Sequence, residues 1–160
     1  MRRVVTDVSP LDSHLGFWLR RVSVHVSQRL ATRLSEHGVT PAEWVLLRIL
    51  HDAGAVAPSV LADRLGFTRG AVTKLVDRLR AKRLVVRAGA GRADRRYQTI
   101  ALTGAGAVLV PVLAAAADAN DAETFGHLDA NERATLDRLL RALVDRARID
   151  ELDANSCSED

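Results

Sequence analysis

The residues of this sequence that could do chemistry are mostly arginines and lysines, and they are concentrated in one stretch. Between Arg64 and Arg96 the chain has eleven basic residues and two acidic ones, a net charge of +9, whereas the whole chain of 160 residues carries +3. A basic block inside an otherwise acidic molecule is typical of a protein that binds a polyanion. The alternative is a solvated charged surface, and charge by itself does not separate the two.

The composition restricts the class of protein. Hydrophobic residues make up 48% of the chain and charged residues 27%, which is typical of a soluble globular protein and excludes wholesale disorder. The length fits one domain, or two small ones that share a core. Aromatic residues are only 4%, so we expect an aliphatic core. No apolar run approaches the roughly 20 residues that span a bilayer. The first residues include no long apolar h-region, so we expect no signal peptide and a cytoplasmic protein with no membrane partner.

Motifs typical of enzymes and metal sites are absent from the sequence. It contains no H-E-x-x-H, G-x-S-x-G, P-loop or dinucleotide fingerprint, so we expect no catalytic residues and no cofactor. The single cysteine, Cys157, lies among acidic residues, which disfavours thiol sensing. Metal binding is disfavoured because the histidines are scattered without an i, i+4 pair: His14, His25, His37, His51 and His127.

The first part of the chain is predicted to be helical. Apolar residues at helical spacing predict a long helix over residues 11–37, ended by Gly38. Its apolar stripe consists of Leu15, Trp18, Leu19, Val22, Val26, Leu30 and Leu34. Thr40-Pro41-Ala42-Glu43 is a capping box that starts a second helix, which runs to about His51 with Trp44, Leu47 and Leu50 on its inner face.

The next two predicted helices form a helix-turn-helix pattern. A short helix over residues 58–65 is stopped by Gly66, and Thr68 is an N-cap for a helix from Arg69 to about Lys82. One face of this second helix is apolar, with Val72, Leu75, Val76 and Leu79. The opposite face is basic and carries small residues: Arg69, Gly70, Thr73, Lys74, Asp77 and Arg78. Such a pair of helices is typical of DNA-binding proteins.

A small β-wing and two long helices complete the predicted fold, which is mainly α. Strands are expected at residues 84–87 and 97–102, with a glycine-rich basic tip between them. Thr103 is predicted to cap an Ala-rich helix to about Phe125, with a kink or a shifted start at Pro111. A capping box at residues 129–132 opens a last helix to about Arg148, with five side chains expected to be buried: Leu136, Leu139, Leu140, Leu143 and Val144. Residues 149–160 are acidic, and we expect them to be a disordered tail.

This order of elements resembles the MarR (multiple-antibiotic-resistance repressor-like) family of bacterial winged-helix regulators. The resemblance depends on four segments, which are VTPAEW at residues 39–44, LADRLG at 61–66, TRGAVTKLVDRL at 68–79, and Asp94-Arg95-Arg96 followed by IALTGAG at 100–106. The family often has a glycine just after the recognition helix, where this chain has Arg83.

The resemblance implies a homodimer on a pseudo-palindromic DNA site. Residues 11–38 and 103–148 would form the helical dimerisation region, and residues 40–102 the winged helix-turn-helix lobe. A small ligand or an oxidant usually weakens DNA binding in this family, and repression is the expected outcome. A dimer also agrees with the residues, because a single helix-turn-helix of this size reads too few base pairs to be selective.

The helix over residues 69–82 is expected to read the major groove. Gly70 would allow a close approach, Arg69 and Thr73 could contact bases, and Thr68, Lys74 and Arg78 could bind phosphates. In the wing, Arg96 matches the arginine of the family's D-x-R motif and would enter the minor groove, held by Asp94. Two further wing arginines, Arg92 and Arg95, would contact phosphates.

The resemblance also implies a ligand crevice between the dimer helices and the DNA-binding lobe. Candidate lining residues are Trp18, Arg21, His25, Trp44 and Arg48. Ordinary packing is the alternative, because bulky aromatic residues such as the two tryptophans fill cores by default. An alternative function is a winged-helix module that binds a protein partner without specific DNA readout.

Overall fold

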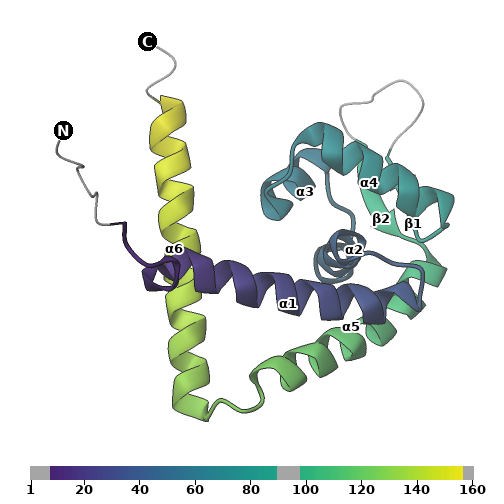
Figure 1. Cartoon of the computed structure of the whole chain (residues 1–160). Coiled ribbons are helices and arrows are strands. Elements are labelled where there is room, and N and C mark those ends of the chain that lie inside the picture. The colour runs from purple at the N-terminus through teal and green to yellow at the C-terminus, as the bar shows by residue number, and fades with distance from the viewer. Residues whose placement is uncertain (1–7, 90–97, 157–160) are drawn as a thin grey trace, which may run out of the picture. The chain divides into compact units, whose positions relative to one another are not determined.

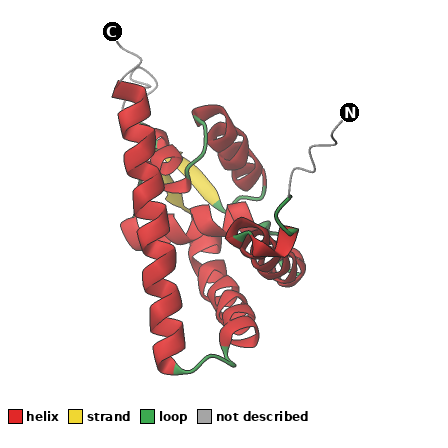
Figure 2. Ribbon diagram, turned by 60° about the vertical axis from the view of Figure 1, so that its left-hand side comes forward, coloured by secondary structure: helices red, strands yellow, loops and turns green. Residues whose placement is uncertain are grey.

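The computed structural model describes residues 8–89 and 98–156. The chain divides into two compact units, residues 1–120 and 121–160, which are described separately below. The described residues are mostly helical (Figure 2), and they include one two-stranded antiparallel sheet. The predicted fold class, mainly α with a small β-wing, is confirmed.

The first long helix is shorter than predicted. Residues Leu11–Ser13 form a 3-10 helix, and α1 spans Leu15–Ser35, because His14 between them is extended. Beyond α1, Gly38 adopts a left-handed conformation with φ +66°. The N–H of Gly38 donates to the Ser35 carbonyl (2.9 Å), and the N–H of Val39 donates to the Leu34 carbonyl (3.1 Å). This pair of bonds is a Schellman motif, so the predicted glycine stop is confirmed.

Helix α2 (Pro41–Ala53) lies in the middle of the first unit (Figure 1). Its predicted capping box is confirmed, because the Thr40 hydroxyl accepts from the Glu43 N–H (3.3 Å) and the Glu43 carboxylate accepts from the Thr40 N–H (2.8 Å). The predicted inner face, Trp44, Leu47 and Leu50, is buried in the core of this unit. Helix α2 therefore forms the central support for the elements around it.

The helix-turn-helix is formed as predicted. Helix α3 spans Pro58–Leu65 and ends at Gly66, which is left-handed with φ +64°. Helix α4 spans Arg69–Ala81, and its N-cap Thr68 accepts a hydrogen bond from the Ala71 N–H (3.2 Å). The predicted apolar stripe on α4 is buried: Val72, Leu75, Val76 and Leu79. The opposite face of α4 is exposed to solvent.

Arg83 ends helix α4 in the conformation that a glycine would adopt easily. Its φ is +59°, its N–H donates to the Arg80 carbonyl (2.9 Å), and the N–H of Leu84 donates to the Leu79 carbonyl (3.0 Å). These are again the bonds of a Schellman motif. A side chain in the left-handed region costs about 1 kcal/mol, so the arginine keeps the geometry of the turn at the expense of stability.

The sheet consists of β1 (Val85–Ala88) and β2 (Thr99–Leu102), paired antiparallel with Val85 opposite Leu102. Val56 adds a bridge to Ile100, with N–H···O distances of 2.9 and 2.8 Å. This bridge connects the α2–α3 loop to the base of the wing. The wing tip at residues 90–97 lies outside the described residues, and with it the predicted contacts of Arg92, Asp94, Arg95 and Arg96.

Helix α5 spans Gly104–Phe125 and is capped as predicted, since the Gly106 N–H donates to the Thr103 hydroxyl (3.0 Å). The helix continues through Pro111, so the alternative of a start shifted to the proline is wrong. Gly106 is buried, and a Cβ there would collide with the Leu84 carbonyl oxygen. By length and composition α5 could cross a membrane. In this fold its Val110 and Leu113 pack into the core of the first unit.

The second unit contains α6 (Ala130–Ser156), which opens on the predicted capping box between Asp129 and Glu132 (2.9 Å in both directions). Two predictions about this helix are wrong. It continues to Ser156, where no glycine or proline stops it, so the disorder expected from residue 149 is not found up to Ser156. Four of the five apolar residues predicted to be buried are 39–60% exposed, because no residue within 8–89 and 98–156 covers them: Leu139, Leu140, Leu143 and Val144.

Candidate nucleic-acid interface

The front half of helix α4, residues 68–74, presents polar and basic side chains to solvent. Thr68, Arg69, Gly70, Thr73 and Lys74 are all exposed. Within the described ranges, neither Arg69 nor Lys74 has an ion pair. Arg69 in the first turn of α4 and Lys74 in the second form a basic surface that favours an anion.

Gly70 and Thr73 define the shape of this surface. A Cβ at Gly70 would meet no atom within 4 Å, so packing inside the protein does not require a glycine there. The Thr73 hydroxyl donates to the Arg69 carbonyl (3.0 Å), which leaves its methyl group and an acceptor oxygen facing outward. A thymine methyl and a base amino group are the partners that such a side chain can meet in a major groove.

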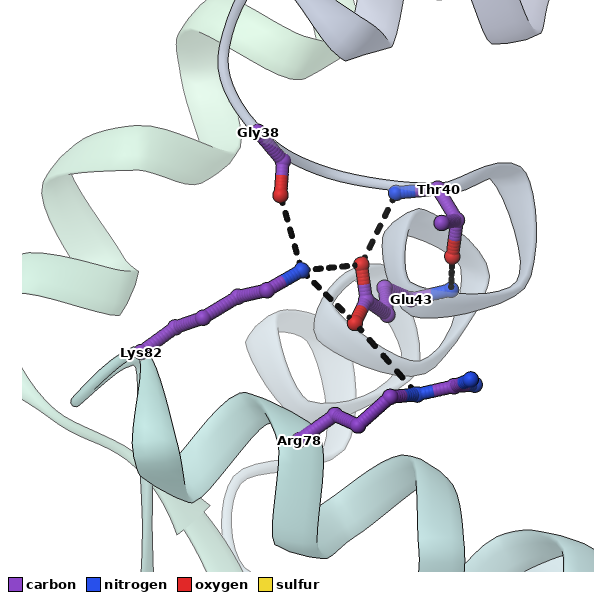
Figure 3. A network of polar contacts seen from close by, with 5 residues as sticks. All are labelled: Gly38, Thr40, Glu43, Arg78 and Lys82. Carbon is purple, nitrogen blue, oxygen red and sulfur yellow. Dashed lines mark hydrogen bonds and ion pairs between the residues drawn. The ribbon is translucent and has the colours of Figure 1, made fainter.

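The rear half of α4, residues 77–82, is held by the rest of the first unit. Figure 3 shows the Lys82 ammonium between the Glu43 carboxylate (2.7 and 2.8 Å) and the Gly38 carbonyl (2.8 Å). The Nε of Arg78 lies 3.8 Å from the same carboxylate, while the Arg78 side chain as a whole remains 60% exposed. The predicted phosphate contact of Arg78 therefore competes with a contact inside the protein.

Glu43 is the buried centre of this network, with no exposed surface. Burial raises the pKa of the Glu43 carboxyl, but the hydrogen bonds from Lys82 and from the Thr40 N–H outweigh that effect. The pKa therefore lies below its ordinary value. Glu43 is ionised at neutral pH, and its charge is compensated by groups on α4 and at the start of α2.

A second contact joins the rear half of α4 to the wing. One oxygen of Asp77 lies 3.2 Å from the Arg87 guanidinium on β1 and 3.5 Å from the Arg80 guanidinium. The carboxylate thus links the recognition helix to the strand that leads towards the wing tip. All four charged residues of the rear half, Asp77, Arg78, Arg80 and Lys82, take part in ion pairs within the protein.

The five candidate ligand residues lie in different surroundings. On α1, Trp18 is 47% exposed and Arg21 lies over its ring, 5.8 Å from the centroid, while His25 is exposed. Trp44 belongs to the core of the first unit. Arg48 is exposed on α2 and pairs with Asp52. Of the five, only Trp18 and Arg21 contact each other through an interaction seen in the described residues.

Similarity to known proteins identifies the family of this chain. A sequence profile of the MarR family matches residues 37–96. A putative transcriptional regulatory protein for the hcr operon of Thauera aromatica is 30% identical over 134 residues, which cover 83% of this chain and 80% of that protein. The transcriptional repressor MdtR of Bacillus subtilis is 27% identical over 141 residues, which cover 88% of this chain and 90% of MdtR. The chain belongs to the MarR family.

Solved MarR family structures have the same fold. Bordetella bronchiseptica BpsR, whose DNA binding is regulated by 6-hydroxynicotinic acid, superimposes with a TM-score of 0.78 at 27% identity, covering 86% of this chain and 98% of BpsR. A mutant of Escherichia coli MarR in complex with operator DNA gives a TM-score of 0.75 at 28% identity, covering 84% of this chain and 99% of that one. This chain is accordingly a transcriptional regulator with a winged helix, as its relatives are.

The contacts of Glu43 with Lys82 and of Asp77 with Arg87 were not predicted from the sequence. Glu43 was identified only as part of a capping box, a role that a glutamine also performs. The one available signal was the choice of an acid at a position next to the buried Trp44. An unpaired carboxylate there would be costly, so a cation had to lie nearby.

Proposed function

We propose that this protein is a dimeric, operator-binding repressor whose two copies each insert the front half of α4 into the major groove of DNA. The observation that carries the proposal is the division of charge along α4. Its rear cations pair with acids of the same chain, whereas Arg69 and Lys74 face solvent without a described partner. A solvated surface needs no such division, and a DNA-reading helix does, because free cations must reach phosphates and base edges.

The exposed apolar residues support a dimer. Leu15, Trp18, Leu19 and Val22 on α1 are 47–85% exposed, as are several apolar residues on α5 and α6. The second unit also has an apolar hollow of about 470 Å³ between the end of α5 and the start of α6, with Phe125, Leu136 and Leu140 in its wall. Apolar surface on this scale marks an interaction site, and a second copy of the chain is the occupant we propose.

The same apolar character explains why α5 is long and apolar enough to cross a membrane. A helix that packs into a core on one side and against a second subunit on the other needs few charges on either. We propose that the protein acts in the cytoplasm, by binding and not by catalysis. The wing would enter the minor groove through Arg96, supported by Asp94, with Arg92 and Arg95 on phosphates.

A small aromatic acid is the effector class that we propose. Among the relatives, BpsR responds to 6-hydroxynicotinic acid, and a MarR family protein of Mycobacterium tuberculosis was solved with salicylic acid. In this chain Trp18 offers an exposed ring and Arg21 lies over it, an arrangement that suits a flat anion. Trp44 fills the core of the first unit, so we do not propose it as a ligand contact. The contact residues that we propose on α1 are Trp18 and Arg21.

Selection of bound fragments from a pool of random duplexes tests the proposed function. The full-length protein is expected to enrich a two-fold symmetric consensus. Affinity for it should fall with salt at a log–log slope near −0.9 per phosphate neutralised. Enrichment of no sequence, or a flat salt dependence, would favour the alternative of a module that binds a protein partner.

A further inference from the structure

We infer that Glu43 and Lys82 form a positioning pair that sets the orientation of α4 in the DNA groove, and so determine operator selectivity without contacting DNA. The inference rests on the proposed function. Lys82 is the first residue after α4, and its ammonium group contacts the Glu43 carboxylate and the Gly38 carbonyl within 2.7–2.8 Å. The charge of this ammonium group is therefore already compensated within the protein, by a carboxylate and a carbonyl, and does not need a phosphate as its partner.

The negative charge of Glu43 is not needed for the capping box at the start of α2. The capping box at the start of α2 functions equally with glutamine, which accepts the same hydrogen bond from the Thr40 N–H. A carboxylate with no exposed surface carries a desolvation penalty that an amide avoids. The cations that compensate the carboxylate both come from the end of α4: Lys82, which lies 39 residues later in the chain and binds it directly, and Arg78 at 3.8 Å. The acid therefore serves the contact with α4 and not the start of α2.

The pair lies where a small change in angle has a large effect on DNA contacts. Helix α4 spans Arg69–Ala81, and with a rise of 1.5 Å per residue its two ends are about 18 Å apart. A tilt of about 5° at the rear would move the front end by about 1.5 Å over that length. Hydrogen bonds to base edges tolerate a distance range of only about 0.5 Å. Contacts between flexible lysines and phosphates tolerate more, so a loosened rear end should weaken specific binding more than non-specific binding.

The position of Gly38 extends the effect of the pair beyond α4. Its carbonyl belongs to the turn between α1 and α2, so one ammonium group joins the end of α1, the start of α2 and the end of α4 (Figure 3). The recognition helix is thus held against the turn that follows the first long helix, and its orientation follows that turn.

The test compares the duplex selected by the wild-type protein with a scrambled duplex of the same length and composition. Full-length Glu43→Gln, Lys82→Met, the double variant and Lys82→Arg are measured at a temperature where each is folded. Asp52→Asn is the matched control, because it removes an exposed carboxylate on the same helix. Each of Glu43→Gln and Lys82→Met is expected to lower the ratio of selected to scrambled affinity about tenfold, the size of one lost base contact.

The affinity ratio of the double variant should fall no further than that of either single variant, because the two substitutions remove the same contact. Lys82→Arg should keep most of the ratio, and Asp52→Asn should leave it within twofold of wild type. If Glu43→Gln does not fold, Lys82→Met and Lys82→Arg make the comparison by themselves, since the Lys82 side chain is partly exposed.

Two results would overturn the positioning role. In the first, the variants melt at lower temperature but keep the wild-type affinity ratio, which would make the pair purely structural. In the second, Lys82→Met weakens binding to both duplexes equally and lowers the log–log salt slope of binding by about 0.9. That result would make Lys82 a phosphate contact. Failure of the proposed function looks different, because the wild-type protein would then enrich no duplex at all.

Discussion

The two halves of helix α4 differ in what their charges do. In the front half, residues 68–74, Arg69 and Lys74 face solvent, and Gly70 leaves open space beside the backbone. In the rear half, residues 77–82, every charged side chain pairs with a group of the same chain. A high density of basic residues is thus not in itself a DNA-binding surface. In the proposed function, part of it holds the helix and the rest reads DNA.

The difference between the two halves is visible along one face of the helix. Residues four apart lie on the same face, and that face carries Lys74, Arg78 and Lys82. Lys74 has no ion pair in the described ranges, the Nε of Arg78 lies 3.8 Å from Glu43 while its side chain remains 60% exposed, and Lys82 binds both Glu43 and the Gly38 carbonyl. The function of a lysine on this face therefore depends on its position along the helix more than on its charge.

The largest expected effect comes from filling the open space at Gly70. Gly70→Leu should lower the affinity for the selected duplex at least a hundredfold, because a large side chain would keep the helix from the groove and remove two or more base contacts, worth about 1–3 kcal/mol each. The free energy of unfolding should stay the same or rise, since leucine is a better helix former than glycine. Gel-shift titration and thermal melting check the two parts.

Gly106 is the control for that substitution. It is also a helical glycine, but a Cβ there would collide with the Leu84 carbonyl oxygen, so Gly106→Ala should destabilise the protein. If Gly70→Leu retained wild-type DNA affinity, the front half of α4 would not be the reading surface.

The next largest effect concerns the stability that Glu43 contributes. Glu43→Gln should lower the free energy of unfolding by about 2 kcal/mol, the size of a hydrogen bond to a charged group. The pKa of Glu43 is lowered in the folded protein, so its contribution is present above the ordinary carboxyl pKa of 4.5 and is lost as the pH falls through the lower, folded value.

Denaturant unfolding of both proteins between pH 7 and pH 3 measures this contribution. The difference in free energy between wild type and Glu43→Gln should be constant near neutrality and shrink below pH 4.5. A difference that does not change over that range would show that the carboxylate charge is not the source of the stability.

A stabilising change is expected at the end of α4. Arg83→Gly should raise the free energy of unfolding by about 1 kcal/mol, because glycine adopts the left-handed conformation of residue 83 without the cost that a Cβ imposes. DNA affinity should remain within about twofold, as the rear half does not contact DNA in this account. Thermal melting measures the first effect, and a loss of stability on substitution would contradict the assignment of strain.

The smallest expected effect is a difference between two lysine variants in the salt dependence of DNA binding. Lys74→Met should lower the log–log salt slope of DNA binding by about 0.9, the value for one phosphate contact. Lys82→Met should leave that slope unchanged, because its ammonium group is already bound within the protein. Equal changes in slope for both variants would mean that the rear half binds DNA as well.

The local parts of the fold were predictable from the sequence. The capping boxes at Thr40 and Asp129, the N-cap at Thr68 and the glycine stops depend on residues within one turn of each other, and all are formed. The left-handed Arg83 was not predicted, because arginine does not indicate that conformation. The Glu43–Lys82 contact was missed for a related reason: 39 residues separate its members, and only the folded core brings them together.

Burial on the long helices was mispredicted for a different physical reason. Helical spacing correctly identifies an apolar face, but it does not tell whether the same chain covers that face. On α4 the stripe is covered by the first unit, whereas on α6 residues such as Leu143 remain 60% exposed. For the candidate site, the exposure of the front-half residues was predictable from type and spacing, and their contact with DNA stays a prediction. The division of α4 into a half without ion pairs and a half held by them required the structure.

Methylation interference on the selected duplex tests the central claim most directly, because the N7 of guanine lies in the major groove. If two copies each place the front half of α4 in that groove, interference should fall in two symmetric clusters about 10 base pairs apart, or a multiple of that spacing. The Arg69→Ala variant should weaken interference at the same position of both clusters. A single cluster, or interference that is uniform along the duplex, would contradict the account.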